Sequence, residues 1–81
     1  MKLISTETSI ISLENVRRVD LIISEDWHTS RGVPYVIKSY LILIRYENNE
    51  YTERIECGNN AKSETMSKEY MDTIKTILAQ D

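Results

Sequence analysis

Two stretches rich in β-branched and aromatic residues flank a pair of asparagines in the middle of the chain. The first stretch is Tyr35–Tyr46 and the second is Tyr51–Cys57, with Asn48 and Asn49 between them. Asparagine tolerates the positive φ angles that a tight hairpin turn requires. The sequence therefore predicts a long β-hairpin, and this element constrains the possible folds more than any other.

The alternation of side chains within this hairpin predicts its register. With Asn48-Asn49 as the turn, one face pairs Tyr46 with Tyr51, Ile44 with Glu53, Ile42 with Ile55 and Tyr40 with Cys57. The opposite face pairs Arg45 with Thr52, Leu43 with Arg54 and Leu41 with Glu56. A slip of one residue would move every apolar side chain to the other face, so the pattern selects this register.

The N-terminal part of the chain predicts further strands. Two short β-like segments, Lys2–Ser5 and Ser9–Leu13, fit either a tight hairpin or one interrupted strand. A turn is expected at Asn15, whose side chain bonds its own backbone readily. The alternation in Val16–Ser24 then indicates a half-buried strand, and the residues that share its apolar face are Val19, Leu21 and Ile23.

The segment Glu25–Pro34 shows no periodicity and contains the breakers Gly32 and Pro34, which predicts a loop. Trp and Arg often anchor interfaces, and functional contacts concentrate on loops. The loop is therefore a candidate binding site, and its candidate residues are Trp27, His28 and Arg31. The alternative is a surface loop in which Trp27 folds back over the edge of a small core.

The C-terminal part of the chain predicts an amphipathic helix after a polar loop at Gly58–Lys62. Its apolar stripe comprises Tyr70, Met71, Ile74, Ile77 and Leu78. The candidate N-cap residues are Ser63, Thr65 and Ser67. Glu64 or Glu69 would place a negative charge in the first turn, where the helix dipole favours it.

These elements predict an α+β fold in a single domain that spans residues 1–81. We expect an antiparallel sheet of four to five strands with a single C-terminal helix packed on one face. One helix covers only one face of a sheet, and the far face is more apolar than solvent exposure requires. The predicted interface on that far face comprises Ile22, Tyr35, Ile37, Leu41 and Leu43.

Composition narrows the class of protein. A domain of 81 residues is small enough that oligomerisation often stabilises such chains. Hydrophobic residues make up 41% of the chain and charged residues 28%, which is typical of a soluble globular domain. The net charge of −3 makes binding to nucleic acid or anionic lipid by bulk electrostatics unlikely. No apolar run approaches the ~20 residues that span a bilayer, so we expect a cytoplasmic protein without membrane contact.

The residue types needed for chemistry are sparse. A single cysteine, Cys57, and a single histidine, His28, do not make a zinc site, and no glycine-rich phosphate loop is present. A nucleophilic pair of Cys57 with His28 is conceivable, but the predicted register buries Cys57 beside Tyr40, where a thiol packs as a small hydrophobe. We therefore expect a protein that is not an enzyme and that holds no metal or cofactor.

Three segments resemble a group of small bacterial proteins of unassigned function. These are the opening Ile11–Val16 (I-S-L-E-N-V), the hairpin with asparagine at its tip, and the closing helix Met71–Leu78 with its I-K-x-I-L pattern. That group is similar to the C-terminal half of pleckstrin-homology-like domains. The resemblance implies a β-sheet with a C-terminal helix and brings no catalytic residues. The chain is too short for the seven strands of the full fold and lacks its basic lipid-binding loop, so lipid binding is not implied.

The combined observations predict a non-enzymatic protein-interaction module that self-associates, as a dimer, through the outer face of its sheet. Another protein partner is also compatible with this surface. The alternative prediction is a small nucleic-acid or host-factor binding protein of phage or mobile-element type. It would use the Trp27–Arg31 loop together with the arginines Arg17, Arg18, Arg45 and Arg54.

Overall fold

The computed structural model of the protein describes residues 2–47 and 51–80. In chain order its elements are β1 (Leu3–Ser5), β2 (Ile10–Ser12), β3 (Val16–Ser30), β4 (Val33–Tyr46), β5 (Thr52–Gly58) and α1 (Ser63–Leu78). Strands β3, β4 and β5 form an antiparallel sheet in that order, and β1 pairs with β2 as a separate ribbon. The predicted α+β class with one C-terminal helix is confirmed, and the strands of the described chain divide into two sheets.

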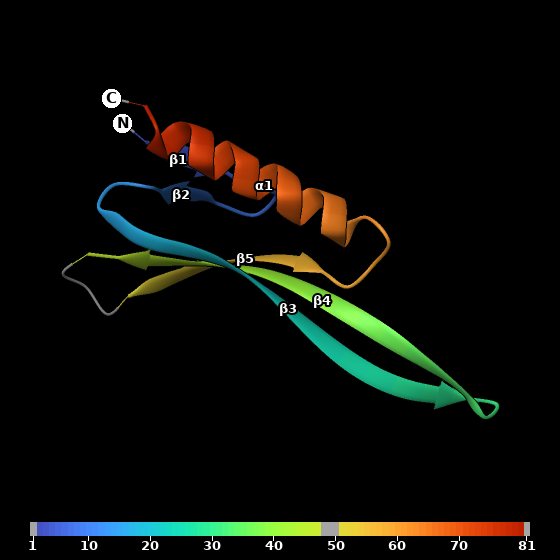
Figure 1. Ribbon diagram of the computed structural model, residues 1–81. Helices are drawn as coiled ribbons and strands as arrows, with labels where there is room; N and C mark the ends of the chain where they lie inside the picture. The colour runs from blue at the N-terminus through green and yellow to red at the C-terminus, as the bar shows by residue number, and fades with distance from the viewer. Residues whose placement is uncertain (1, 48–50, 81) are drawn as a thin grey trace.

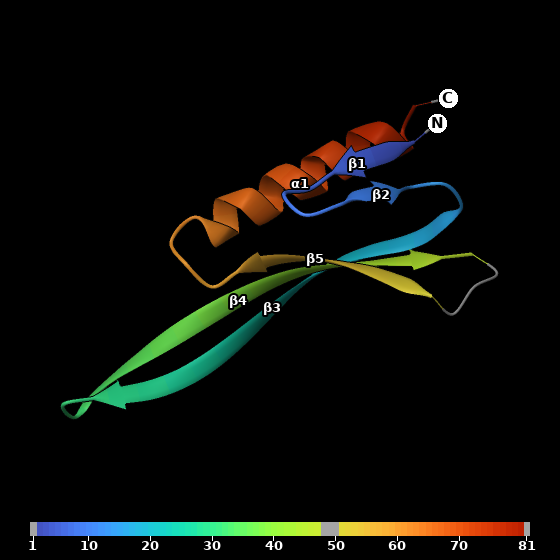
Figure 2. The same cartoon turned by 180° about the vertical axis from the view of Figure 1, so that it is seen from behind.

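Helix α1 and the β1–β2 ribbon lie on the same side of the three-stranded sheet (Figure 1). The view from behind shows the same arrangement (Figure 2). We call the covered side the inner face and the opposite side the outer face. The core between the two layers consists of Ile4, Ile11, Leu13, Tyr40, Ile42, Ile44, Ile55, Cys57 and Ile74. Burial of this apolar set supplies the main driving force for folding.

The β4–β5 register matches the prediction from Leu41 to Arg45. Ile42 pairs with Ile55 and Ile44 with Glu53 on the inner face. The predicted pairing of Tyr40 with Cys57 is wrong, because the register shifts between Leu41 and Tyr40, and Tyr40 therefore pairs with Gly58. The shift is a β-bulge next to Gly58, which has a φ of 87° that favours glycine. The predicted turn at Asn48-Asn49 lies outside the described residues.

The N-terminal segments form a tight hairpin, not one interrupted strand. Thr6 closes it, because its backbone N–H donates to the Ser9 carbonyl at 2.8 Å and its Oγ1 donates to the same carbonyl at 3.1 Å. The expected turn before β3 is present at Asn15, which has a φ of 61°. The hairpin places Ile4 and Ile11 opposite each other, and both side chains are buried against the sheet.

The predicted loop at Glu25–Pro34 is wrong. Strand β3 continues to Ser30, a two-residue turn follows, and β4 begins at Val33. The turn residues Arg31 and Gly32 have φ values of 53° and 77°, the type of turn that suits the twist of a hairpin. Arginine at a positive φ is uncommon, so the residue types here do not indicate that so short a turn is present.

The corrected hairpin extends beyond the rest of the sheet. Strand β5 ends at Gly58, opposite Tyr40, so the segment 24–39 is a two-stranded ribbon without a third strand. We call this segment the arm. It projects away from α1 and the ribbon (Figure 1), and it gives the molecule principal extents of 53 × 24 × 21 Å.

Helix α1 begins without a side-chain cap, so the predicted capping role of Ser63, Thr65 or Ser67 is wrong. The Asn60 side chain instead accepts hydrogen bonds from the Lys62 N–H at 2.8 Å and from Ser63 Oγ at 3.2 Å. Ser63 is fully buried and lies so near Gly58 that a Cβ there would be 3.3 Å from Ser63 Oγ. Small side chains at the start of α1 let the helix approach the sheet closely. The expected acid in the first turn is present as Glu64.

The predicted apolar stripe of the helix faces the sheet. Ile74 is buried at its centre, and Tyr70, Met71, Ile77 and Leu78 pack against the core. The helix lies over β4 and β5, and Ile23, on the same apolar face of β3 as Val19 and Leu21, is 51% exposed.

Replacing Ile42 with alanine tests whether this core holds the layers together. Ile42 is fully buried between the sheet and its cover, so Ile42→Ala should lower the free energy of unfolding by about 2–5 kcal/mol. The matched control is Ile10→Ala, because Ile10 lies in β2 with 69% of its surface exposed. Urea unfolding at one protein concentration measures both. A smaller loss for Ile42→Ala than for Ile10→Ala would contradict this account of the core.

Candidate functional site

The outer face of the sheet carries all five residues of the predicted interface. Ile22 pairs with Leu41 across β3 and β4, and Leu43 lies two positions further along β4 on the same face. Tyr35 and Ile37 continue this row into the arm, because side chains two positions apart along a strand point to the same side. The prediction that these residues share one face is therefore confirmed by the strand register.

These outer-face side chains are partly accessible. Ile22 is 39% exposed and Tyr35 is 44% exposed, whereas Ile37, Leu41 and Leu43 are half-buried by their neighbours in the sheet. Within residues 2–47 and 51–80, no helix or strand packs over them, since α1 and the β1–β2 ribbon lie on the inner face (Figures 1 and 2). The row forms an uncovered apolar strip along the sheet.

Charged side chains border this apolar strip. Arg18 forms an ion pair with Asp20 at 3.0 Å, and Arg45 lies opposite Arg18 on the neighbouring strand. On β5, Arg54 lies beside Leu43 and Glu56 beside Leu41. An apolar centre with a charged rim is the usual anatomy of a protein–protein interface.

The predicted binding loop does not exist as one site. Trp27 pairs with Val36 on the inner side of the arm and is 64% exposed, whereas His28 pairs with Tyr35 on the outer side. Arg31 lies in the turn at the tip of the arm. The alternation of β3 separates Trp27 from His28, and Arg31 lies beyond the end of that strand, so the predicted loop site is wrong.

A small polar cluster stands on the outer side of the arm. The His28 Nε2 atom lies 3.0 Å from Asp26 Oδ2, and the imidazole stacks on the Tyr35 ring with a centroid distance of 5.4 Å. Both contacts hold His28 flat against the strand. The cluster contributes a polar, aromatic surface next to the apolar strip, where Tyr is a frequent interface residue.

Cys57 and His28 are separated by the fold. Cys57 lies in the core on the inner face of β5, where its Sγ is 3.8 Å from the Ile55 carbonyl oxygen, and His28 lies on the outer side of the arm. Burial raises the pKa of the Cys57 thiol above its ordinary value. A raised pKa keeps the thiol protonated and unreactive. The geometry therefore gives no nucleophilic pair.

Tyr46, at the end of β4, and Tyr51, directly before β5, pack against each other. Their rings stack with a centroid distance of 6.3 Å, and the Tyr46 hydroxyl donates to the Ser12 carbonyl at 2.7 Å. Burial raises the pKa of Tyr46, and the hydrogen bond from the Tyr51 hydroxyl to Glu53 raises the pKa of Tyr51. Both shifts move the phenols further from neutrality, away from general acid or base chemistry.

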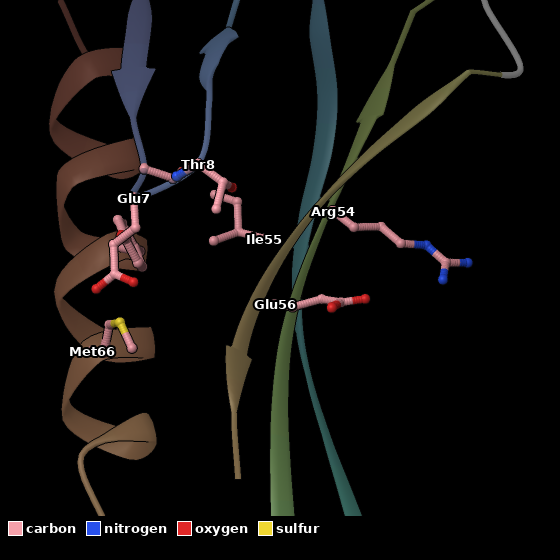
Figure 3. Close-up of a pocket in the computed structure, with 8 residues that line it drawn as sticks. Glu7, Thr8, Arg54, Ile55, Glu56 and Met66 are labelled. Atoms are coloured by element: carbon pink, nitrogen blue, oxygen red, sulfur yellow. The ribbon is translucent and has the colours of Figure 1, made fainter. Parts of the chain in front are cut away.

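A hollow of about 270 Å³ lies between the β1–β2 turn, β5 and α1. Figure 3 shows Glu7 and Met66 close together on one side of it and Ile55 directed towards them. The charged ends of Arg54 and Glu56 point away from the helix, towards the outer face (Figure 3). Glu7 is thus the one acid that reaches into the hollow among the residues lining it, and a lone carboxylate defines no reaction.

Residues 2–47 and 51–80 contain no cluster of three or more His, Cys, Asp or Glu side chains placed to hold a metal ion. Over the same residues, no helix has the length and apolar character needed to cross a membrane.

Comparison with known proteins does not assign the chain to a family. No family model matches it, and no curated protein or solved structure is significantly similar to it. The resemblance to small bacterial proteins and pleckstrin-homology-like domains therefore stays a prediction. The candidate site rests on geometry alone, and that geometry points to the outer face.

The reactivity of Cys57 tests its placement in the core. We expect the folded protein to react with an aromatic disulfide reagent far more slowly than the urea-unfolded chain, because the thiol is buried and its pKa is raised. Since a raised pKa keeps the thiol protonated, moving from pH 7 to pH 8 should produce less thiolate in the folded protein than in the unfolded chain. The absorbance of the released thiol measures both rates. Equal rates in the two states would contradict the burial and reopen a catalytic role.

Proposed function

We propose that the protein is a non-enzymatic interaction module that self-associates through the outer face of its β3–β4–β5 sheet. The observation that carries this proposal is the uncovered apolar strip formed by Ile22, Tyr35, Ile37, Leu41 and Leu43. Monomeric proteins rarely leave a long contiguous apolar surface exposed, and such surfaces mark interaction sites.

The size of the domain supports self-association. An 81-residue chain has a small core, and a second copy packed on the outer face would bury the apolar side that α1 does not reach. The free-energy scale is about 25 cal/mol for each Å² of apolar surface removed from water. Two sheets that pack face to face in this way form a layered structure with a spacing of about 10 Å.

The chemistry of the described residues supports a role in binding. Cys57 is buried, and His28 contacts Asp26 and Tyr35. Of the two acids that line the hollow beside α1, Glu7 and Glu56, the second points away from the helix (Figure 3). The single cysteine and the balance of charged residues support a cytoplasmic location. Another protein with a complementary apolar face would use the same strip.

Leu41→Asp tests the outer face. A charge at the centre of the strip should lower the mass of the assembly, because burying an unpaired carboxylate costs several kcal/mol. Size-exclusion chromatography with light scattering measures the mass, and circular dichroism checks that the variant is folded. The matched control is Leu3→Asp, because Leu3 lies in β1 away from the outer face with 43% of its surface exposed.

Two results would overturn this proposal. One is a wild-type mass equal to the 9.5 kDa of a single chain at high protein concentration. The other is an equal response of the assembly to Leu41→Asp and Leu3→Asp. Salt-sensitive retention on heparin would instead favour the nucleic-acid alternative, because Arg18, Arg45 and Arg54 share the outer face.

A further inference from the structure

The free edge of β3 is a second surface that is open to binding. In the sheet order β3-β4-β5, β3 is an edge strand along its whole length. The two-residue turn at Arg31-Gly32 makes Ser30 and Val33 a hydrogen-bonded pair, and such pairs alternate along an antiparallel ladder. The odd-numbered residues of β3 from Val19 to Thr29 therefore direct their N–H and C=O groups outward, away from β4.

This edge carries few of the devices that protect edge strands: Glu25 is the one charged side chain among its outward residues, and an irregularity interrupts the strand between Val16 and Arg18. The free edge of β4 in the arm carries Pro34, which has no N–H, and Lys38, and both residues direct their backbone outward. The outward residues of β3 include no proline and no lysine, and Ile23 and Trp27 among them are 51% and 64% exposed. One edge of the arm is thus blocked against strand pairing and the other is open.

We propose that the free edge of β3 pairs antiparallel with β3 of a second copy, with a two-fold axis at Ile22. This arrangement places Leu21 opposite Ile23 of the second copy, and Arg18 opposite Asp26. Leu21 and Ile23 then form an apolar pair on each side of the axis, and the opposite charges of Arg18 and Asp26 meet at each end of the paired stretch, while Val19 lies opposite Glu25 between them.

Neighbouring registers fit less well. An axis at Ile23 places Asp20 opposite Asp26, and like charges directly opposite each other are destabilising. An axis at Leu21 pairs Val19 with Ile23, but it places the Ile22 side chain opposite Asp20, and its one pair of opposite charges, Arg17 with Glu25, falls in the irregular stretch between Val16 and Arg18. The chosen register also pairs the regular stretch Arg18–Asp26 and ends at the irregularity between Val16 and Arg18. The self-complementary charges identify a second copy, and not an unrelated peptide, as the occupant.

This contact is separate from the outer-face contact. It joins two three-stranded sheets edge to edge and gives the base of the arm a neighbouring strand that β5 does not supply. An isolated two-stranded ribbon is only marginally stable, so the arm gains order from the pairing. The outer face remains free for face-to-face packing, so the two contacts together build an assembly larger than either alone.

Disulfide trapping tests the register. In a Cys57→Ser background, Ile22→Cys places two thiols directly opposite each other across the axis, with Cα atoms about 4.5 Å apart, within the range for a disulfide. Ser24→Cys is the matched control, because the register separates its two copies by about 13 Å along the strands. We expect oxidised Ile22→Cys to cross-link at least ~10-fold faster than Ser24→Cys. Equal or reversed rates would overturn the proposed register.

Proline substitution tests the edge itself. Ile23→Pro removes an outward N–H that the pairing uses, whereas Thr29→Pro removes an outward N–H beyond the paired stretch. Both retain the hydrogen bonds to β4, since edge strands accept proline where the N–H faces outward. Ile23→Pro should reduce the mass measured by light scattering, and Thr29→Pro should not. A wild-type mass that neither variant changes would overturn the proposal.

Two measurements separate this proposal from the outer-face proposal. Leu41→Asp should retain a dimer that Ile23→Pro then abolishes; a Leu41→Asp monomer at all concentrations would overturn edge pairing and leave the outer face standing. If the wild-type assembly keeps its mass in Leu41→Asp but is lost in Ile23→Pro, the outer-face proposal is overturned and edge pairing stands. Amide hydrogen exchange in the wild type needs no substitution: the Leu21 and Ile23 amides should be protected in the assembly, and the Thr29 amide should not.

Discussion

The packing of Ile42 and Ile44 against a cover made from both ends of the chain is the interaction on which the structure depends. These side chains lie at the centre of β4, and α1 and the β1–β2 ribbon close over them from the same side. Because the described chain has no further helix or strand, both covering elements lie on the inner face and none is left for the outer face. The exposed outer face and the exposed arm are consequences of that choice.

The outer face and the edge of β3 are two different kinds of exposed surface in one small domain, and we propose that both bind a second copy. The outer face offers side chains, and its apolar strip has a charged rim that includes the Arg18–Asp20 pair. The edge of β3 offers backbone donors and acceptors, which bind another strand with little dependence on side-chain identity. Pro34 and Lys38 restrict strand pairing on the β4 side, so the chain directs association to one edge.

Much of the fold was predictable, because period-two alternation is a strong local signal. The register of β4 with β5 from Leu41 to Arg45 and the five residues of the outer face followed from it, and the apolar stripe of the helix followed from the helical period of 3.6 residues. The arm was missed because Gly32 and Pro34 are usual loop residues and Arg31 is a rare residue at positive φ. The predicted side-chain cap of the helix was wrong because Ser63 is buried in the core beside Gly58, which no local pattern reveals.

The sequence by itself determined which side chains share a face, since alternation along a strand needs only local backbone geometry. Tertiary structure alone decided which elements cover which face. It placed the β1–β2 ribbon beside α1, left Ile23 exposed and made β3 the free edge. These features depend on contacts between segments far apart in the chain. The packing of the whole domain sets which segments cover the apolar face of the sheet.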